Sequence, residues 1–441
     1  MQLPRHPSRF AVQADLLDFA EDPGFAVDAG AAVRFLPDGW LLVADGRIVA
    51  ARPADGPPGE DWPRIDRRGH LLTPGFVDTH VHAPQLDVIA SFGTELLDWL
   101  RTYTFPAEER YADPDTARTG AARFLDALLM HGVTAAVVFP TVHKVSADAL
   151  FAEARERGMR LVAGKVLMDR NSPEALSDRD VASAERDCVD LIERWHGRDR
   201  LAYAVTPRFA PTSSEAQLAL CGRLLHDYAQ RDGGLYLQTH VAENRAEVEW
   251  VRALFPQARS YLDVYARHGL LGRRSIFAHG IWLDDVDRAA LAGAGAQIAF
   301  CPSSNLFLGS GLFAWGEAAA AGVTVTLASD VGGGTSLCPL RTMADAYKVL
   351  ALRGERLTAW KALYSATRGA ARALGLEHEI GHLGAGTMAD FVVWHWARGP
   401  VQQRRQDMAC NLHERVFAWM LLGDDRNVAA SFVRGREVYA G

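Results

Sequence analysis

Residues 74–82 read Pro-Gly-Phe-Val-Asp-Thr-His-Val-His, and this stretch decides the fold prediction. Its apolar and β-branched residues predict a short buried strand, in which alternate side chains point to the same face. Asp78, His80 and His82 therefore share one face. Two imidazoles held two residues apart on a rigid strand can bind one divalent metal ion. A His-x-His pair by itself is commonly coincidental, so this interpretation depends on the rest of the chain.

Strand and helix patterns alternate along the chain after this stretch. The eight strand-like segments are 76–82, 134–139, 161–167, 202–207, 235–241, 275–279, 297–302 and 323–329. Helical patterns include 113–130, 214–230, 243–254 and 340–352. Repeated alternation of this kind predicts an α/β fold, a (β/α)8 TIM-like barrel. A doubly wound open sheet is the alternative, but the glycine fingerprint that would favour it does not follow the first strand.

The two ends of the chain resemble each other and differ from the middle. Strand-like pieces flank Asp45-Gly46, a typical hairpin turn, and similar pieces recur after residue 390. We therefore expect a small flanking β-sandwich domain built from residues 1–73 and 384–441. The barrel would then occupy residues 74–383.

Composition narrows the class of protein. The 441 residues carry a formal net charge of −7, which predicts no basic surface for nucleic acid or an anionic membrane. Residues 1–10 lack the apolar segment of a secretory signal, and no apolar run approaches the roughly 18 residues of a spanning helix. The five cysteines are scattered without a Cys-x-x-Cys pair. They predict reduced thiols in a cytoplasmic protein, with neither disulfides nor a thiolate zinc site.

Candidate metal ligands recur where the predicted strands end, which is the active-site face of such a barrel. His240, His279 and Asp330 join His80 and His82 there. Nitrogen-rich ligation with one carboxylate suits Zn2+, with iron(II) as an alternative. Three histidines and one aspartate leave room for a water molecule, which zinc would ionise near neutral pH. The sequence therefore predicts a catalytic metal site.

Lys165 and Glu243 are further candidates near this face. A modified lysine can bridge two metals in related barrels, but Lys165 lies in the third predicted strand and the fourth has no lysine, so we expect one metal and an ordinary amine. Glu243 follows His240 by three residues, where the strand ends and a helix begins. A carboxylate there can be a first-turn helix acid or a proton carrier beside the metal. The neighbouring metal site favours the second role.

These motifs resemble the amidohydrolase superfamily, on residues 74–82, the later histidines and Ser329-Asp330. Within it the chain resembles the guanine deaminase family, in the stretches 82–85, 91–100, 103–108, 206–212, 240–244, 301–305 and 329–334. The resemblance covers essentially the whole chain and is strongest in the barrel motifs. Cys301 departs from the family, which often has asparagine there, and we expect the change to be tolerated because this side chain should not touch the metal.

The resemblance implies a hydrolase of cyclic amidine C–N bonds that converts guanine to xanthine and ammonia in purine catabolism. Zinc, one ion per chain, would be held by His80, His82, His240 and Asp330, with His279 beside it on the bound water or substrate. Asp330 would take a proton from the nucleophilic water, which attacks C2, and Glu243 would protonate the ring nitrogen. The catalytic set implied is thus Glu243, His279 and Asp330. A homodimer is implied as well, whereas the expectation of no nucleic-acid or membrane partner comes from the charge and hydropathy of the sequence.

The substrate contacts implied are His82, Gln85, Arg208, Phe209 and His240. A guanidinium and an amide can bond the O6 and N1 edge of guanine, while a phenyl ring packs on the base. Adenine carries an amino group at position six and would leave donors on Arg208 or Gln85 unpaired. Without the resemblance, Arg208 would be read as a surface ion pair and Phe209 as a core aromatic.

Two other functions stay open at this point. A different amidohydrolase could keep the metal ligands and act on another purine, a pterin or a triazine, with a changed region around Gln85, Arg208 and Phe209. A catalytically inactive barrel used for binding or assembly is the alternative from another class. Such a protein would be expected to lose metal ligands, and this chain keeps them together with Glu243.

Overall fold

The computed structural model describes residues 7–93 and 95–441. Residues 1–6 lie outside this part. They belong to the predicted β domain and to the segment 1–10, which lacks the pattern of a secretory signal. The described chain forms two compact units, one of residues 7–78, 126–135 and 337–441, the other of 79–93, 95–125 and 136–336. The expected domain boundaries after residues 73 and 383 stay a prediction, because compactness does not establish which segments fold independently.

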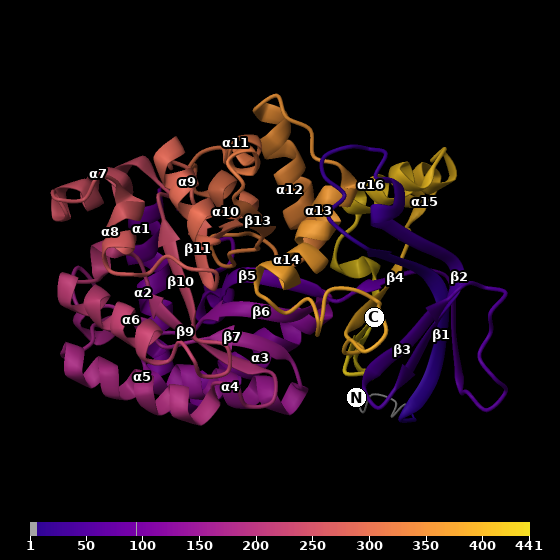
Figure 1. Cartoon of the computed structure of the whole chain (residues 1–441), viewed down its shortest axis with the longest axis horizontal. Helices are drawn as coiled ribbons and strands as arrows, with labels where there is room; N and C mark the ends of the chain where they lie inside the picture. The colour runs from indigo at the N-terminus through magenta and orange to yellow at the C-terminus, as the bar shows by residue number, and fades with distance from the viewer. Residues whose placement is uncertain (1–6, 94) are drawn as a thin grey trace. The chain divides into compact units, whose positions relative to one another are not determined.

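The predicted parallel barrel is confirmed, with strands that match the expected segments closely. They are β5 Phe76–His82, β6 Val133–Phe139, β7 Arg160–Ala163, β8 Val166–Leu167, β9 Leu201–Pro207, β10 Tyr236–Val241, β11 Ser275–His279, β12 Gln297–Phe300 and β13 Thr324–Leu327. They pair in the order β13-β12-β11-β10-β9-β7-β6-β5, with β8 on β9 (Figure 1). Backbone bonds from Asp330 N to His80 O and from His82 N to Val331 O, both 2.9 Å, nearly close the ring.

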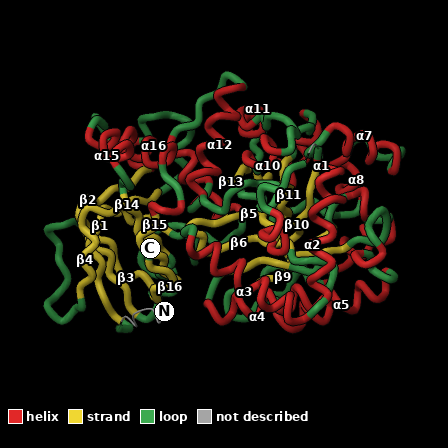
Figure 2. Tube along the Cα trace, turned by 180° about the vertical axis from the view of Figure 1, so that it is seen from behind, coloured by secondary structure: helices red, strands yellow, loops and turns green. Residues whose placement is uncertain are grey.

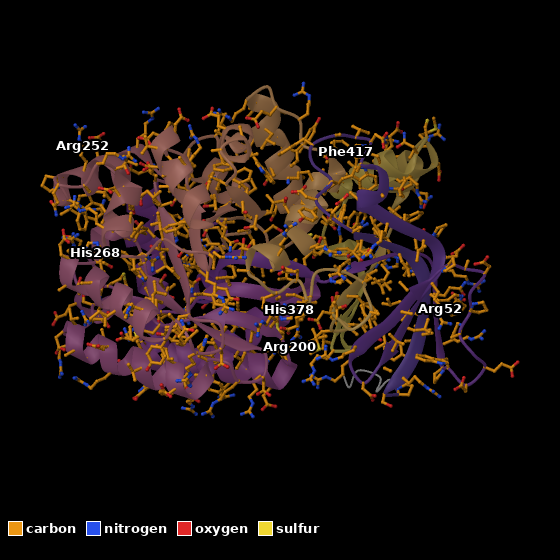
Figure 3. All side chains as sticks on the ribbon, in the orientation of Figure 1. Arg52, Arg200, Arg252, His268, His378 and Phe417 are labelled. Carbon is orange, nitrogen blue, oxygen red and sulfur yellow. The ribbon has the colours of Figure 1, made fainter. Side chains whose placement is uncertain are left out.

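Helices surround the barrel strands, and some of them begin at a residue whose side chain caps the helix. Their bounds are α1 Leu96–Trp99, α2 Phe105–Glu109, α3 Pro114–Met130, α4 Lys144–Arg157, α5 Val181–Trp195, α6 Glu215–Asp227, α7 Arg245–Leu254, α8 Tyr261–Arg267, α9 Asp285–Ala294, α10 Pro302–Phe307 and α11 Trp315–Ala320. The side chains of Asp180, Ser214 and Asp284 accept backbone N–H groups at the starts of α5, α6 and α9, which satisfies donors that a helix leaves unpaired. Arg252 on α7 is 80% exposed on the outside of this layer (Figure 3).

The predicted strand 161–167 is interrupted. Gly164 and Lys165 separate β7 from β8, and a Cβ atom at Gly164 would lie 1.8 Å from the carbonyl oxygen of Ala204. Only glycine permits this close approach of two backbones. The interruption directs Lys165 into the protein, where its side chain is 1% exposed and pairs with the carboxylate of Asp178.

The chain ends supply a separate sheet, as predicted. Its strands are β1 Arg9–Phe19, β2 Val33–Ala44, β3 Arg47–Arg52, β4 Arg64–Pro74, β14 Phe391–His395, β15 Val428–Val433 and β16 Arg436–Ala440, in the order β16-β15-β14-β4-β1-β2-β3 (Figure 2). The β2–β3 hairpin turns at Asp45 and Gly46, whose φ angles of 50° and 77° are those of a tight hairpin turn. Phe391 stacks on Phe432 at 4.3 Å between ring centroids, within one apolar core. The same unit contains α12 Pro339–Leu352, α13 Ala359–Ser365, α14 Arg368–Ala373, α15 Pro400–Asp407 and α16 Leu412–Leu422.

Two sequence-based expectations concern the chain as a whole. Across residues 7–93 and 95–441, no helix combines the length and apolar character needed to cross a bilayer. The five cysteines are free thiols, and four of them are buried.

Candidate active site

Side chains from several strand ends meet inside the unit that contains residues 79–125 and 136–336. His80 and His82 come from β5, His240 from β10, His279 from the end of β11, and Asp330 from the loop after β13. His279 and Asp330 have φ angles of 70° and 50°, a left-handed conformation that is rare for residues other than glycine. Strained backbone of this kind is concentrated at functional sites, where the surrounding packing imposes it.

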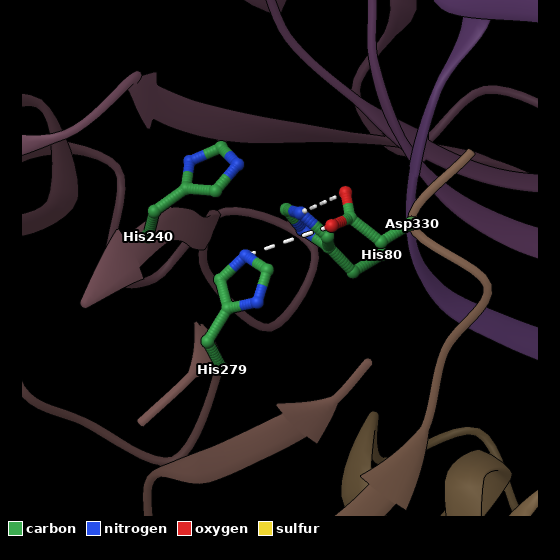
Figure 4. A group of neighbouring side chains, drawn as sticks. All are labelled: His80, His240, His279 and Asp330. Carbon is green, nitrogen blue, oxygen red and sulfur yellow. Dashed lines mark ion pairs between the residues drawn. The ribbon is translucent and has the colours of Figure 1, made fainter. Parts of the chain in front are cut away.

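The imidazole nitrogens lie within a few ångströms of one another. The Nε2 atom of His82 is 3.3 Å from Nε2 of His80 and 3.2 Å from Nε2 of His240. Asp330 Oδ1 is 3.2 Å from His80 Nε2 and 3.3 Å from His82 Nε2. His80, His240, His279 and Asp330 each offer a ligand atom within 4.8 Å of the others (Figure 4). The structure thus brings all five predicted ligand candidates together, and the group that meets the 4.8 Å limit contains His279 rather than His82.

In His240 and His279, the ring nitrogen that points away from the cluster makes a hydrogen bond. That bond determines which ring nitrogen can present a lone pair to the cluster. His240 Nδ1 donates to the carbonyl of Arg208 at 2.7 Å, and His279 Nδ1 donates to Asn305 Oδ1 at 2.9 Å. In the neutral form of each ring, Nε2 therefore carries the lone pair and is available to a cation, which is how ligand histidines are oriented in metal sites. Two imidazole nitrogens 3.2 Å apart, such as Nε2 of His82 and Nε2 of His240, can share a hydrogen bond or bind one cation between them.

The protonation states of His82, His240 and Asp330 also suit a metal site. Burial lowers the pKa of His82 to about 3 and that of His240 well below its ordinary value. Burial alone would raise the pKa of Asp330, but contacts with His80 and His82 outweigh it and hold that pKa well below its usual range. Neutral imidazoles and an ionised carboxylate are the forms that bind a metal. The donor set therefore fits a divalent transition metal.

Glu243 lies beside this cluster, in the loop between β10 and α7. Its Oε2 is 3.4 Å from Nε2 of His279, and its Oε1 accepts a hydrogen bond from the hydroxyl of Ser310 at 3.1 Å. The helix begins only at Arg245, with Asn244 as its N-cap, so Glu243 is not the first-turn helix acid that was the alternative reading. Burial, with the negative charge of Asp330, raises the pKa of Glu243 to about 8. A carboxyl group with a pKa near neutrality can both take up and release a proton.

The predicted substrate residues Gln85 and Arg208 are both buried, at 2% and 3% exposure. Arg208 is not a surface residue: its Nη1 donates to both carboxylate oxygens of Glu108, at 2.9 and 2.7 Å. Gln85 Nε2 donates to the same carboxylate at 3.0 Å. Phe209 packs edge-on against Trp250, with 6.2 Å between ring centroids.

One pocket joins the cluster and the predicted substrate residues. Polar groups of the cluster and apolar side chains line it together: His82, Gln85, Leu96, Trp99, Leu100, Arg208, Phe209, His240, Glu243, Glu247, His279, Leu308, Asp330 and Gly333. A pocket in which polar groups converge beside apolar walls is typical of a small-molecule site.

The amidohydrolase family matches residues 71–438 of this chain, a segment that includes every side chain of the cluster. The chain belongs to the amidohydrolase family. Among curated relatives, this amidohydrolase is 43% identical to the guanine deaminase of Escherichia coli (strain K12), over 97% of each chain. Among solved structures, E. coli guanine deaminase aligns with a TM-score of 0.93 at 41% identity, covering 99% of this chain and 100% of that one. The guanine deaminase of C. acetobutylicum, solved with guanine bound in its active site, aligns with a TM-score of 0.87 at 27% identity, over 98% and 100% of the two chains.

Sequence reasoning assigned no role to several residues of this amidohydrolase that hold the site together. Glu108 lies in the stretch 103–108, and the resemblance of that stretch to the family was the only sign that Glu108 matters. The neighbouring residues in the sequence did not indicate its hydrogen-bond partners. Ser310 and Asn305 position Glu243 and His279 from the segment after β12. Glu247 is the N3 residue of α7, and its Oε2 accepts from the backbone N–H of Glu243 at 3.0 Å. The same oxygen accepts the capping-box bond from the N–H of Asn244 at 3.1 Å, and the two bonds together hold the backbone from which the Glu243 side chain extends.

Proposed function

We propose that this amidohydrolase deaminates guanine, releasing xanthine and ammonia. The observation that carries the proposal is that a single pocket contains both a cluster suited to a metal and a buried guanidinium–amide pair suited to a lactam edge. The guanine deaminase relatives, one of them with guanine in its active site, support the choice of substrate.

We propose zinc, one ion per chain, as the metal. The residues that would hold it are His80, His82, His240 and Asp330, with His279 beside them. The choice rests on a donor set rich in imidazole nitrogen with one carboxylate, which suits zinc better than calcium or magnesium. When bound, the ion would supply a water molecule that ionises near neutral pH and can act as a nucleophile.

The protein's own groups would then orient the purine and move its protons. Arg208 and Gln85 would hold the O6 and N1 edge of guanine, and Phe209 would pack against the base. Asp330 would accept a proton from the attacking water. Glu243 would deliver a proton to the purine ring and then take up the proton of the hydroxyl added at C2. The proton held by Asp330 would pass to the amino group, so that ammonia leaves from C2 and a carbonyl remains there. The buried position of Glu243 between His279 and Ser310 supports this role.

The test is incubation of the purified protein with guanine, followed by ultraviolet absorbance for xanthine and by an ammonia assay. The same assay is run on a panel of other aminated purines, pterins and triazines, and metal content is measured in parallel. Xanthine from guanine at a rate well above the other compounds supports the proposal. Ammonia from another heterocycle, with guanine unchanged, would assign a different substrate, and a metal-free inactive protein would favour a binding role.

We propose further that the protein is cytoplasmic and works as a homodimer. The free thiols suit a reducing compartment. The dimer follows from the resemblance to guanine deaminases alone. Light scattering coupled to size-exclusion chromatography measures the mass directly, and a mass near that of one 48.2 kDa chain would contradict the dimer.

A further inference from the structure

The carboxylate of Glu108 contacts two pocket residues at once. Its Oε1 accepts from Nη1 of Arg208 at 2.9 Å and from Nε2 of Gln85 at 3.0 Å, and its Oε2 accepts from the same Arg208 nitrogen at 2.7 Å. Arg208 and Gln85 line the pocket, whereas Glu108 is 0% exposed behind them. Any effect of Glu108 on a bound molecule therefore passes through these two side chains.

Glu108 determines which end of the Gln85 amide meets the pocket. A carboxylate can only accept hydrogen bonds, so the NH2 group of Gln85 must point toward it. The Gln85 oxygen then accepts from the backbone N–H of Gly332 at 3.3 Å, which excludes the flipped orientation. One N–H of Gln85 and one lone pair on its oxygen remain for a ligand.

Glu108 also limits what the Arg208 guanidinium offers. Nη1 donates to both oxygens of the carboxylate, so Nε and Nη2 are the guanidinium nitrogens that this ion pair leaves for other acceptors. The guanidinium carbon lies 5.4 Å from the ring centroid of Phe105. Phe105 and Glu108 are three residues apart on α2, where side chains share one face of a helix. The helix thus supports Arg208 through an ion pair and an aromatic ring.

We propose that Glu108 is a positioning residue that sets the substrate preference of this pocket. It holds Arg208 as a donor and Gln85 with an accepting oxygen, which matches a ring carbonyl next to a ring N–H. A purine with an amino group at that edge and an unprotonated ring nitrogen presents the reverse pattern: it donates where guanine accepts and accepts where guanine donates. Such a purine leaves buried groups unpaired, and sites built on hydrogen bonds reject it for that reason. The inference rests on the proposed function, because it concerns how guanine is chosen.

The test compares guanine with 2,6-diaminopurine in the wild type and in Glu108→Gln, both metal-loaded. The two compounds share the 2-amino group and differ at the edge that Arg208 and Gln85 would read. An amide at 108 can donate as well as accept, so the Gln85 amide is no longer held in one orientation. We expect the KM for guanine to rise at least about tenfold with kcat changed less than about threefold, a loss of binding rather than of chemistry. The preference for guanine over 2,6-diaminopurine, as a ratio of kcat/KM values, should fall at least about tenfold.

Asp287→Asn is the matched control, because it removes a buried carboxylate from another arginine pair, with Arg259, away from the pocket. It should leave the substrate ratio unchanged even if its melting temperature falls. Metal content is measured in every variant. A folded, metal-loaded Glu108→Gln protein with an unchanged ratio, or with equal losses on both substrates, would overturn the proposal.

Glu108→Asp covers the case in which Glu108→Gln does not fold. It keeps the charge opposite Arg208 but is one methylene shorter, so it cannot hold Arg208 and Gln85 together. We expect an intermediate fall in the guanine preference, and an unchanged preference in the folded protein contradicts the inference. Failure of the proposed function looks different, because the wild type would then produce no xanthine from guanine.

Discussion

The backbone carbonyl of Arg208 accepts a hydrogen bond from Nδ1 of His240 at 2.7 Å, so a proposed purine-binding residue also orients a proposed metal ligand. The same carbonyl accepts from the backbone N–H of His240 and from the hydroxyl of Thr239, each at 3.2 Å. Only the main chain of Arg208 makes these contacts. Substitution of its side chain should therefore separate substrate binding from metal binding.

Arg208→Ala should raise the KM for guanine at least about 30-fold and keep the metal content of the wild type. The variant leaves Glu108 buried without its partner, so we expect a loss of about 3 kcal/mol of stability as well. Steady-state kinetics, elemental analysis and thermal unfolding measure the three effects. Arg259→Ala, which removes the arginine that pairs with Asp284 and Asp287, is the control and should keep the wild-type KM. Equal loss of metal and of guanine use would show that the Arg208 side chain has a different role.

Glu243→Gln should reduce kcat at least about 100-fold while the fold and the metal content are preserved, as expected for loss of a general acid–base group. The amide is nearly isosteric and can still accept from Ser310, so the loop should keep its structure. Ser310→Ala, which removes only that hydrogen bond, should cause a smaller loss. Near-normal turnover in Glu243→Gln would remove this residue from the proposed mechanism.

Removal of metal by a strong chelator should abolish ammonia release, and added Zn2+ should restore it. The melting temperature should also fall on chelation, because an ion that binds only the folded state stabilises that state. An ion present at 100 times its dissociation constant contributes about 2.7 kcal/mol. His82→Asn, which loses the nitrogen closest to both His80 and His240, should bind less metal at equal protein concentration. Full activity and an unchanged melting temperature after verified removal would exclude a metal role.

Lys165→Met should lower the stability by about 3 to 5 kcal/mol, because it leaves the carboxylate of Asp178 buried without its counterion. The two side chains are 1% and 5% exposed. The double variant Lys165→Met, Asp178→Asn should be less destabilised than the single one, since it buries no unpaired charge. Metal content per chain should not change in either, and a halved content would instead indicate that Lys165 bridges two ions. Denaturant unfolding and elemental analysis decide both points.

Acid should destabilise the protein partly through His395. Burial, together with the positive charge of Arg398 and the neighbouring His70, lowers the pKa of His395 to about 4. In the unfolded chain this group titrates near its ordinary pKa of about 6.5, so the unfolded state takes up the proton first as the pH falls. Stability is therefore lost between about pH 6.5 and pH 4, in line with proton linkage. The melting temperature of His395→Gln should fall less over that range than that of the wild type, whereas a change at His226, which is 89% exposed, should have no such effect.

The barrel and its candidate metal ligands could be predicted from the sequence, because the patterns that indicate them involve residues close together along the chain. The predicted strand 76–82 matches β5, and alternation along it places His80 and His82 on one face. The rule that barrel sites lie at strand ends then led to His240 and Asp330 without knowledge of any distance. Asp45-Gly46 likewise specified its hairpin, because the turn type depends on the two residues themselves.

The partners of buried charges were decided only by the tertiary structure. Glu108 and Arg208 are 100 residues apart, and Lys165 and Asp178 lie in different segments, so no periodicity relates them. Glu243 falls outside α7 because Asn244 caps the helix, a boundary that hydrophobic pattern does not resolve. The sequence by itself thus determined the barrel, the hairpin and the set of candidate ligands, since these follow from neighbours along the chain. Packing decided which carboxylate faces which cation, because that choice depends on contacts between segments that meet only once the strands have closed into a barrel.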